Sequence, residues 1–189
     1  MNQGLIPQRY AKALYKVALE RGCAGQLYEL MKTLENSFSA NADLERVMEN
    51  PFVEAARKQA LLLTAAGAAD SDAAEPQGAV ATFVDFVKLL ERNKRIEFVR
   101  GAALAYIALY RKECNISTVT VTSASPLDDK ASARLKDLVS RQLNGATVEF
   151  KEQVDPDLIG GFTVAIDNRR LDASIKNELK QLRLKLLSH

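Results

Sequence analysis

Two pairs of neighbouring carboxylates are the residues whose types and spacing come closest to those of a catalytic site. Asp128 and Asp129 are adjacent, and Asp155 and Asp157 flank a proline. General acid–base catalysis needs two groups whose surroundings move their pKa values apart. The first pair falls in the first turn of a predicted helix, where negative charge is favourable in any case. The second pair lies in a predicted turn. We therefore interpret both pairs as structural.

The glycine pair Gly160-Gly161 invites comparison with a phosphate-binding loop. The chain contains no Gly-Lys dipeptide and no G-x-G-x-x-G, so the known nucleotide-binding patterns are absent. The glycines are better explained as the backbone freedom required by a tight turn before a strand. A small enzyme that uses the turn from Asp155 to Gly161 stays open as an alternative, and it would lose turnover on Asp155→Asn or Asp157→Asn.

Histidine and cysteine chemistry is nearly excluded by the composition. The single histidine is the last residue, His189, and the two cysteines, Cys23 and Cys114, form no C-x-x-C motif. Histidine-based metal sites and histidine-dependent catalytic triads are therefore not expected. Unpaired, distant cysteines are typical of a reduced, cytosolic protein. We predict no catalytic residue, no metal and no cofactor.

The elements that hold the turn are predicted from hydrophobic period. Phe162, Val164 and Ile166 alternate with smaller or polar residues, which indicates a strand with one buried face. A very short strand from Arg170 to Asp172 is expected to return beside it. A final amphipathic helix follows, because four apolar residues recur at spacings of four, three and four, namely Ile175, Leu179, Leu182 and Leu186.

The first part of the chain has a helical period throughout. Six helices joined by short turns are predicted up to residue 113, which indicates an antiparallel bundle. The period then changes near Cys114, where Val119 and Val121 alternate with threonines as in a strand. The predicted fold class is mainly α: a six-helix bundle over residues 1–113, followed by a small α+β domain over residues 114–189.

Two helices of the bundle carry more apolar surface than one contact needs. In the first helix, Tyr15 and Leu19 border a core stripe of Tyr10, Leu14, Val17 and Ala18. In the fifth helix, Phe86 and Leu89 extend a stripe of Val80, Phe83, Val87 and Leu90. These wide arcs predict either a groove that accepts an amphipathic helix or a broader buried surface inside the bundle.

Charge and hydropathy limit the class of partner. The chain has 189 residues, 47% of them hydrophobic, and a formal net charge of +2. Nothing therefore favours nucleic acid or anionic lipid, and basic residues such as Arg92, Lys94 and Arg95 are interpreted as scattered surface charge. No apolar run approaches the roughly 18 residues that span a bilayer. No signal or transit segment is recognised, which fits a bacterial protein.

Four stretches stand out, in order along the chain: Arg9–Leu14 (RYAKAL), Leu89–Arg95 (LLERNKR), Val121–Leu127 (VTSASPL), and the run Val154–Gly161 (VDPDLIGG) with Leu171–Ile175 (LDASI). Together they resemble the delta subunit of F-type ATP synthases, whose mitochondrial counterpart is the oligomycin-sensitivity-conferring protein. Within the last run, Asp155, Pro156, Gly160 and Gly161 form the family's signature turn. The resemblance covers nearly the whole chain.

The resemblance implies a non-catalytic subunit of the peripheral stalk, which keeps the catalytic head from rotating during ATP synthesis driven by an ion gradient. The bundle is then expected to receive the N-terminal helix of an alpha subunit between its first and fifth helices, at Tyr15, Leu19, Phe86 and Leu89. The C-terminal domain is expected to bind the C-terminal end of the b-type stalk protein. One copy per complex is expected, peripheral to the cytoplasmic face of the bacterial inner membrane. A helical adaptor of another complex is the alternative.

Overall fold

The computed structural model describes residues 4–68, 78–125, 128, 132–134, 136–137, 141, 147–155, 158, 161–166 and 169–174, with the backbone alone at 161 and 169–174. The chain divides into two compact units, Met1–Lys112 and Glu113–His189. Each unit is described by itself.

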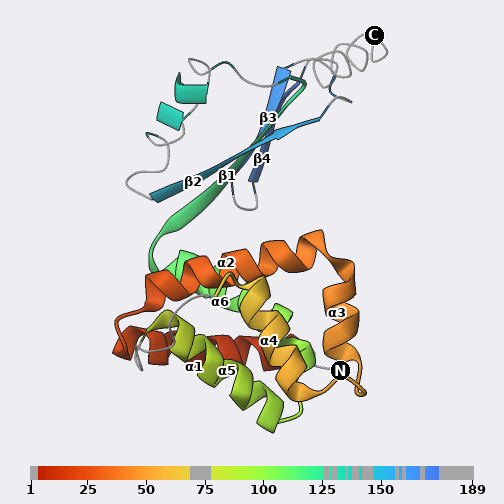
Figure 1. Ribbon diagram of the computed structural model, residues 1–189. Coiled ribbons are helices and arrows are strands. Elements are labelled where there is room, and N and C mark those ends of the chain that lie inside the picture. Colours follow the sequence, from red (N-terminus) through yellow and green to blue (C-terminus); the bar gives the residue numbers. More distant parts are fainter. Residues whose placement is uncertain are drawn as a thin grey trace, which may run out of the picture. The chain divides into compact units, whose positions relative to one another are not determined.

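Unit 1 is helical (Figure 1). Its α-helices are α1 (Leu5–Glu20), α2 (Ala24–Ala40), α3 (Ala42–Glu49), α4 (Ala55–Ala65), α5 (Ala79–Arg92) and α6 (Val99–Glu113), and a 3₁₀ turn, η1 (Ile96–Phe98), precedes α6. All six α-helices contribute to one apolar core. At its centre, Leu27, Met31 and Leu34 of α2 meet Phe83, Val87 and Leu90 of α5, and all six are fully buried.

Most predicted core positions of unit 1 are confirmed, with an exception on α1. Leu14 and Ala18 of α1 are buried, as are Val99 and Ala103 of α6. Val17, predicted in the core stripe, is instead 38% exposed. The apolar arc of α1 is wider than the surface that the neighbouring helices cover, so Val17 lies outside the contact.

Left-handed residues end three helices of unit 1 in the same way. After α1, Gly22 has φ +67°, and the Cys23 N–H donates to the Ala18 carbonyl at 2.9 Å. Gly67 plays the same part after α4. After α5 the left-handed residue is Lys94, with φ 54°. In each case the residue after the left-handed one donates its N–H to the carbonyl five residues earlier. This is the hydrogen bond of the Schellman motif, in which the left-handed residue is normally glycine.

Unit 2 contains a four-stranded sheet in the order β2-β1-β3-β4. The strands are β1 (Ile116–Ser123), β2 (Thr147–Val154), β3 (Gly161–Ile166) and β4 (Arg169–Ser174). β2 runs parallel to β1, while β3 and β4 are antiparallel to their neighbours. A parallel pair needs a crossover connection, and the described residues 132–134, 136–137 and 141 between β1 and β2 are helical.

A small apolar cluster fills one face of this sheet. Val119, Val121 and Val164 are buried in it, with Phe162 and Ile166 packed against them, as the alternation predicted. Two details differ from a one-sided strand. Thr163 is also buried, so both faces of β3 are covered, and Val154 at the end of β2 is exposed. β4 is longer than the predicted return strand.

The mainly helical character with a small sheet is therefore confirmed. The predicted final helix from Ile175 lies outside the described residues, as do Pro156 and Gly160 of the signature turn.

Candidate functional site

The helices α1 and α5 lie beside each other and are tied together near both ends. At one end, the Arg21 guanidinium donates to the Asp85 carboxylate at 3.0 Å and to the Thr82 hydroxyl at 3.1 Å. At the other end, the Tyr10 hydroxyl accepts a hydrogen bond from the Asn93 side-chain amide at 3.0 Å and one from Arg95 at 3.5 Å. Polar pairs therefore fix the spacing of the two helices.

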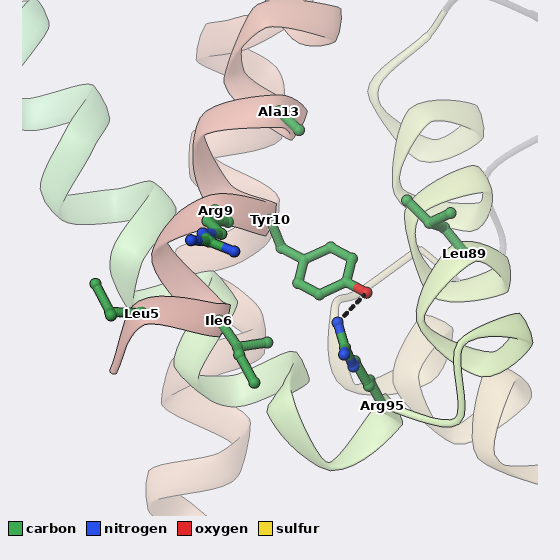
Figure 2. A pocket seen from close by; sticks show the side chains of 7 residues that line it. All are labelled: Leu5, Ile6, Arg9, Tyr10, Ala13, Leu89 and Arg95. Atoms are coloured by element: carbon green, nitrogen blue, oxygen red, sulfur yellow. Dashed lines mark hydrogen bonds between the residues drawn. The ribbon is translucent and has the colours of Figure 1, made fainter. Parts of the chain in front are cut away.

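Between these ties, two adjoining cavities open along the helix pair. The larger has a volume of about 500 Å³ and is shown in Figure 2; it is lined by Leu5, Ile6, Arg9, Tyr10, Ala13, Leu89 and Arg95. The smaller has a volume of about 220 Å³ and is lined by Ala13, Leu14, Val17, Arg21, Thr82, Asp85, Phe86 and Leu89. The cavities share Ala13 and Leu89, and together they are called the α1/α5 groove below.

The groove is apolar along its length and polar at its ends. Leu5, Val17 and Leu89 are exposed large apolar side chains that line it. Figure 2 shows the Tyr10 ring reaching from α1 towards Arg95, between Ile6 and Leu89. Its ring edge also meets the buried Phe86 ring, with the centroids 6.4 Å apart. A contiguous apolar surface with a polar rim is typical of a site for a protein partner.

The four residues predicted for this groove have different places in the structure. Leu89 is 45% exposed and lines both cavities, and Phe86 is 4% exposed and lines the smaller one. Leu19 is 54% exposed but lines neither cavity. Tyr15 also lines neither; its ring packs edge-on against Tyr106 and Tyr110 of α6. Tyr15 thus faces the bundle, which is the second of the two predicted explanations.

Sequence reasoning missed the α1 side of the groove. Ile6, Tyr10, Ala13 and Val17 recur at spacings of four, three and four, which is itself a helical stripe. This signal was available, but it overlaps the core stripe of Leu14 and Ala18. Arg95, interpreted as scattered surface charge, lies at the end of the groove.

The structure describes one member of each carboxylate pair, Asp128 and Asp155. Asp128 is exposed, and Asp155 follows β2, where its N–H donates to the Ser123 carbonyl at 2.9 Å. The Leu158 N–H donates in turn to the Asp155 carbonyl at 3.1 Å. Asp129 and Asp157 lie outside the described residues, and Gly161 opens β3. Among the described residues, no three His, Cys, Asp or Glu side chains are grouped to hold a metal.

Comparison with known proteins identifies the family. The sequence model described as "ATP synthase delta (OSCP) subunit" matches residues 6–186. The chain belongs to this family. It is 36% identical to ATP synthase subunit delta of Parabacteroides distasonis over 189 residues, which is 100% of this chain and 99% of that one. It is 32% identical to the Synechococcus elongatus delta subunit over 94% of this chain and 93% of that one.

A solved structure agrees with the fold. A chain of the mitochondrial ATP synthase hexamer of Toxoplasma gondii superposes with a TM-score of 0.66 at 19% identity, over 96% of this chain and 97% of that one. The family model and the two delta subunits confirm the resemblance stated from the sequence. The chain is a non-catalytic, peripheral-stalk subunit of an F-type ATP synthase, and the comparisons do not support the adaptor alternative.

As a member of the family, the chain associates with the alpha subunits and the peripheral stalk. It is peripheral to the membrane. Within the described ranges, no helix combines the length and apolar character that crossing a bilayer requires.

Proposed function

We propose that the α1/α5 groove receives the N-terminal amphipathic helix of an alpha subunit and so attaches this chain to the catalytic head. In this proposal, residues 1–113 act as one antiparallel six-helix bundle, and residues 114–189 hold the C-terminal end of the b-type stalk protein. One copy serves each complex, at the cytoplasmic face of the bacterial inner membrane.

The observation that carries the proposal is the open apolar groove between two helices whose spacing is fixed at both ends. An amphipathic helix that lays its apolar face into a groove is a recurrent mode of recognition. A site formed before binding loses little freedom when the partner docks, which favours tight association. A stalk that resists torque needs affinity and stiffness, and no chemistry.

The experiment is calorimetric titration of the full chain with a peptide that spans the N-terminal helix of the alpha protein from the same organism, called the alpha peptide below. Leu89→Asp is the informative variant, because it places a charge in the groove at a side chain that is already 45% exposed. Phe86→Asp is less suitable, since Phe86 is buried and the change would destabilise the bundle. We expect Leu89→Asp to weaken binding at least about tenfold, as loss of a central apolar contact does.

Leu104→Asp is the matched control. Leu104 lies on α6, is also 45% exposed and does not line the groove. It should bind the alpha peptide within about twofold of wild type, as a substitution outside an interface does. If both variants weakened peptide binding equally, or if only Leu104→Asp weakened it, the peptide would bind outside the groove. If the wild-type chain did not bind the alpha peptide, the proposed docking in the groove would be wrong.

The proposed role of residues 114–189 is tested separately with a peptide that spans the C-terminal end of the b-type stalk protein. Its binding should be unaffected by Leu89→Asp, because the two attachments use different units. A loss of binding to this second peptide in the variant would contradict the division of roles.

A further inference from the structure

The two ends of the α1/α5 groove differ in charge. At the end formed by Arg21 and Asp85, a cation and an anion are paired at 3.0 Å. At the other end, the larger cavity is lined by two arginines, Arg9 and Arg95. Within the described residues, neither of these arginines forms an ion pair with a carboxylate. An apolar groove is thus neutral at one end and positive at the other.

The positive end is partly fixed in position. Arg95 donates to the Tyr10 hydroxyl, as Figure 2 shows, and it follows the left-handed residue Lys94. The Arg95 N–H closes the end of α5 on the Leu90 carbonyl at 2.8 Å. Arg9 lies on α1, one residue before Tyr10. Both guanidinium groups are therefore carried by ordered backbone beside the apolar surface.

Resting on the proposed function, we propose that Arg9 and Arg95 are the carboxylate-binding end of the α1/α5 groove, and that they select a docked helix with acidic side chains at one end. Guanidinium groups bind carboxylates through charge-assisted, often bidentate hydrogen bonds. Because the opposite end is neutral, this contact also sets the direction in which the helix lies.

The dimensions of the groove agree with such an occupant. Its α1 wall extends from Leu5 to Val17, which is roughly 18 Å at the helical rise of about 1.5 Å per residue. A docked helix of about three turns fills this length. Its apolar residues cover Ala13 and Leu89, and its acidic residues reach the arginines just beyond.

Arg9 and Arg95 contribute more to the specificity and the association rate of docking than to its affinity. Both arginines are exposed, and exposed ion pairs are individually weak and are screened by salt. Complementary charge at the rim of an interface mainly directs the encounter and the register of docking. The effect should therefore be modest, salt-dependent and specific to this end of the groove.

The test is calorimetric titration of the full chain with the alpha peptide at about 20 and about 200 mM NaCl. In the double variant Arg9→Gln/Arg95→Gln we expect a loss of about 3- to 10-fold in affinity at low salt, and a smaller change between the two salt concentrations than in wild type. A peptide whose Asp and Glu are replaced by Asn and Gln should bind wild type and double variant alike.

The matched control is Lys12→Gln/Lys16→Gln. It removes the same charge from exposed positions of α1 that do not line the groove, and it should retain wild-type affinity within about twofold. Equal behaviour of the two double variants would overturn the proposal while leaving the groove in place, provided that Leu89→Asp still weakens binding. If the wild-type chain does not bind the alpha peptide, the proposed function fails and this inference fails with it.

Discussion

Tyr10 joins the two walls of the groove through a single hydroxyl. Its ring contacts Phe86 of α5, and its oxygen accepts from Asn93 and Arg95 beyond the end of that helix. Tyr10→Phe keeps the ring and removes the acceptor. We expect the free energy of unfolding to fall by about 0.5–1.5 kcal/mol, the usual net contribution of such a hydrogen bond.

A double-mutant cycle separates this hydrogen bond from other effects. Tyr10→Phe and Asn93→Ala should each destabilise the chain in urea unfolding. The double variant should lose less free energy of unfolding than the two single variants added together, because either change alone already removes the hydrogen bond between the two side chains. Strict additivity would show that the pair contributes nothing to the spacing of α1 and α5.

The sequence predicts the core of unit 1 better than it predicts the groove, for a reason visible at single residues. Phe83, Val87 and Leu90 are fully buried as expected, because a regular stripe must face the protein interior. Val17 and Tyr15 both belong to the wide apolar arc of α1, yet Val17 lines the groove and Tyr15 packs on α6. Periodicity gives the width of an apolar arc, whereas the neighbouring helices decide which part of it they cover.

The turn after α5 places a lysine where helix ends of this type use glycine. Lys94 has φ 54°, and the turn that contains it holds Asn93 and Arg95 against Tyr10. Left-handed backbone is costly for a residue with a Cβ atom. Lys94→Gly should therefore raise the free energy of unfolding, by about 0.5–1 kcal/mol after the greater flexibility of glycine in the unfolded chain is included.

Lys88→Gly is the control for this substitution. Lys88 is an exposed residue inside α5 with helical backbone, and glycine there should destabilise by about 1 kcal/mol. Urea unfolding of the two variants should thus give opposite signs. Destabilisation by Lys94→Gly would mean that the lysine side chain itself supports the turn.

Among the strands, alternation predicted the buried residues of β1 and β3 but not their surroundings. Val119, Val121 and Val164 are buried as expected. The burial of Thr163 and the exposure of Val154 depend on what covers the second face of β3 and the end of the edge strand β2. A single strand's sequence does not contain this information, because it belongs to the partners that pack on the sheet.

The whole chain offers a natural way to observe its two units separately. It has five tyrosines and no tryptophan, and all five tyrosines, at positions 10, 15, 28, 106 and 110, lie in unit 1. Among the described residues, the two apolar cores share no member. Tyrosine fluorescence therefore reports unfolding of unit 1, whereas far-ultraviolet circular dichroism reports both units.

We predict that Val121→Ala, in the core of unit 2, costs about 2 kcal/mol and shifts only the circular-dichroism transition in urea. Leu90→Ala, in the core of unit 1, should shift the tyrosine transition by a larger amount, since a larger side chain is lost. If Val121→Ala moved the tyrosine transition equally, the two units would unfold as one cooperative body.

We propose above that the N-terminal helix of an alpha subunit docks between α1 and α5. The most direct test is nuclear magnetic resonance of the isotope-labelled full chain, titrated with the alpha peptide. If the helix docks in the groove, amide shifts should concentrate at Tyr10, Ala13, Val17, Phe86 and Leu89, and amides around Leu104 and in β1 to β3 should stay unchanged. Shifts centred on α6 around Leu104 or on the sheet, with the groove residues unmoved, would contradict this docking.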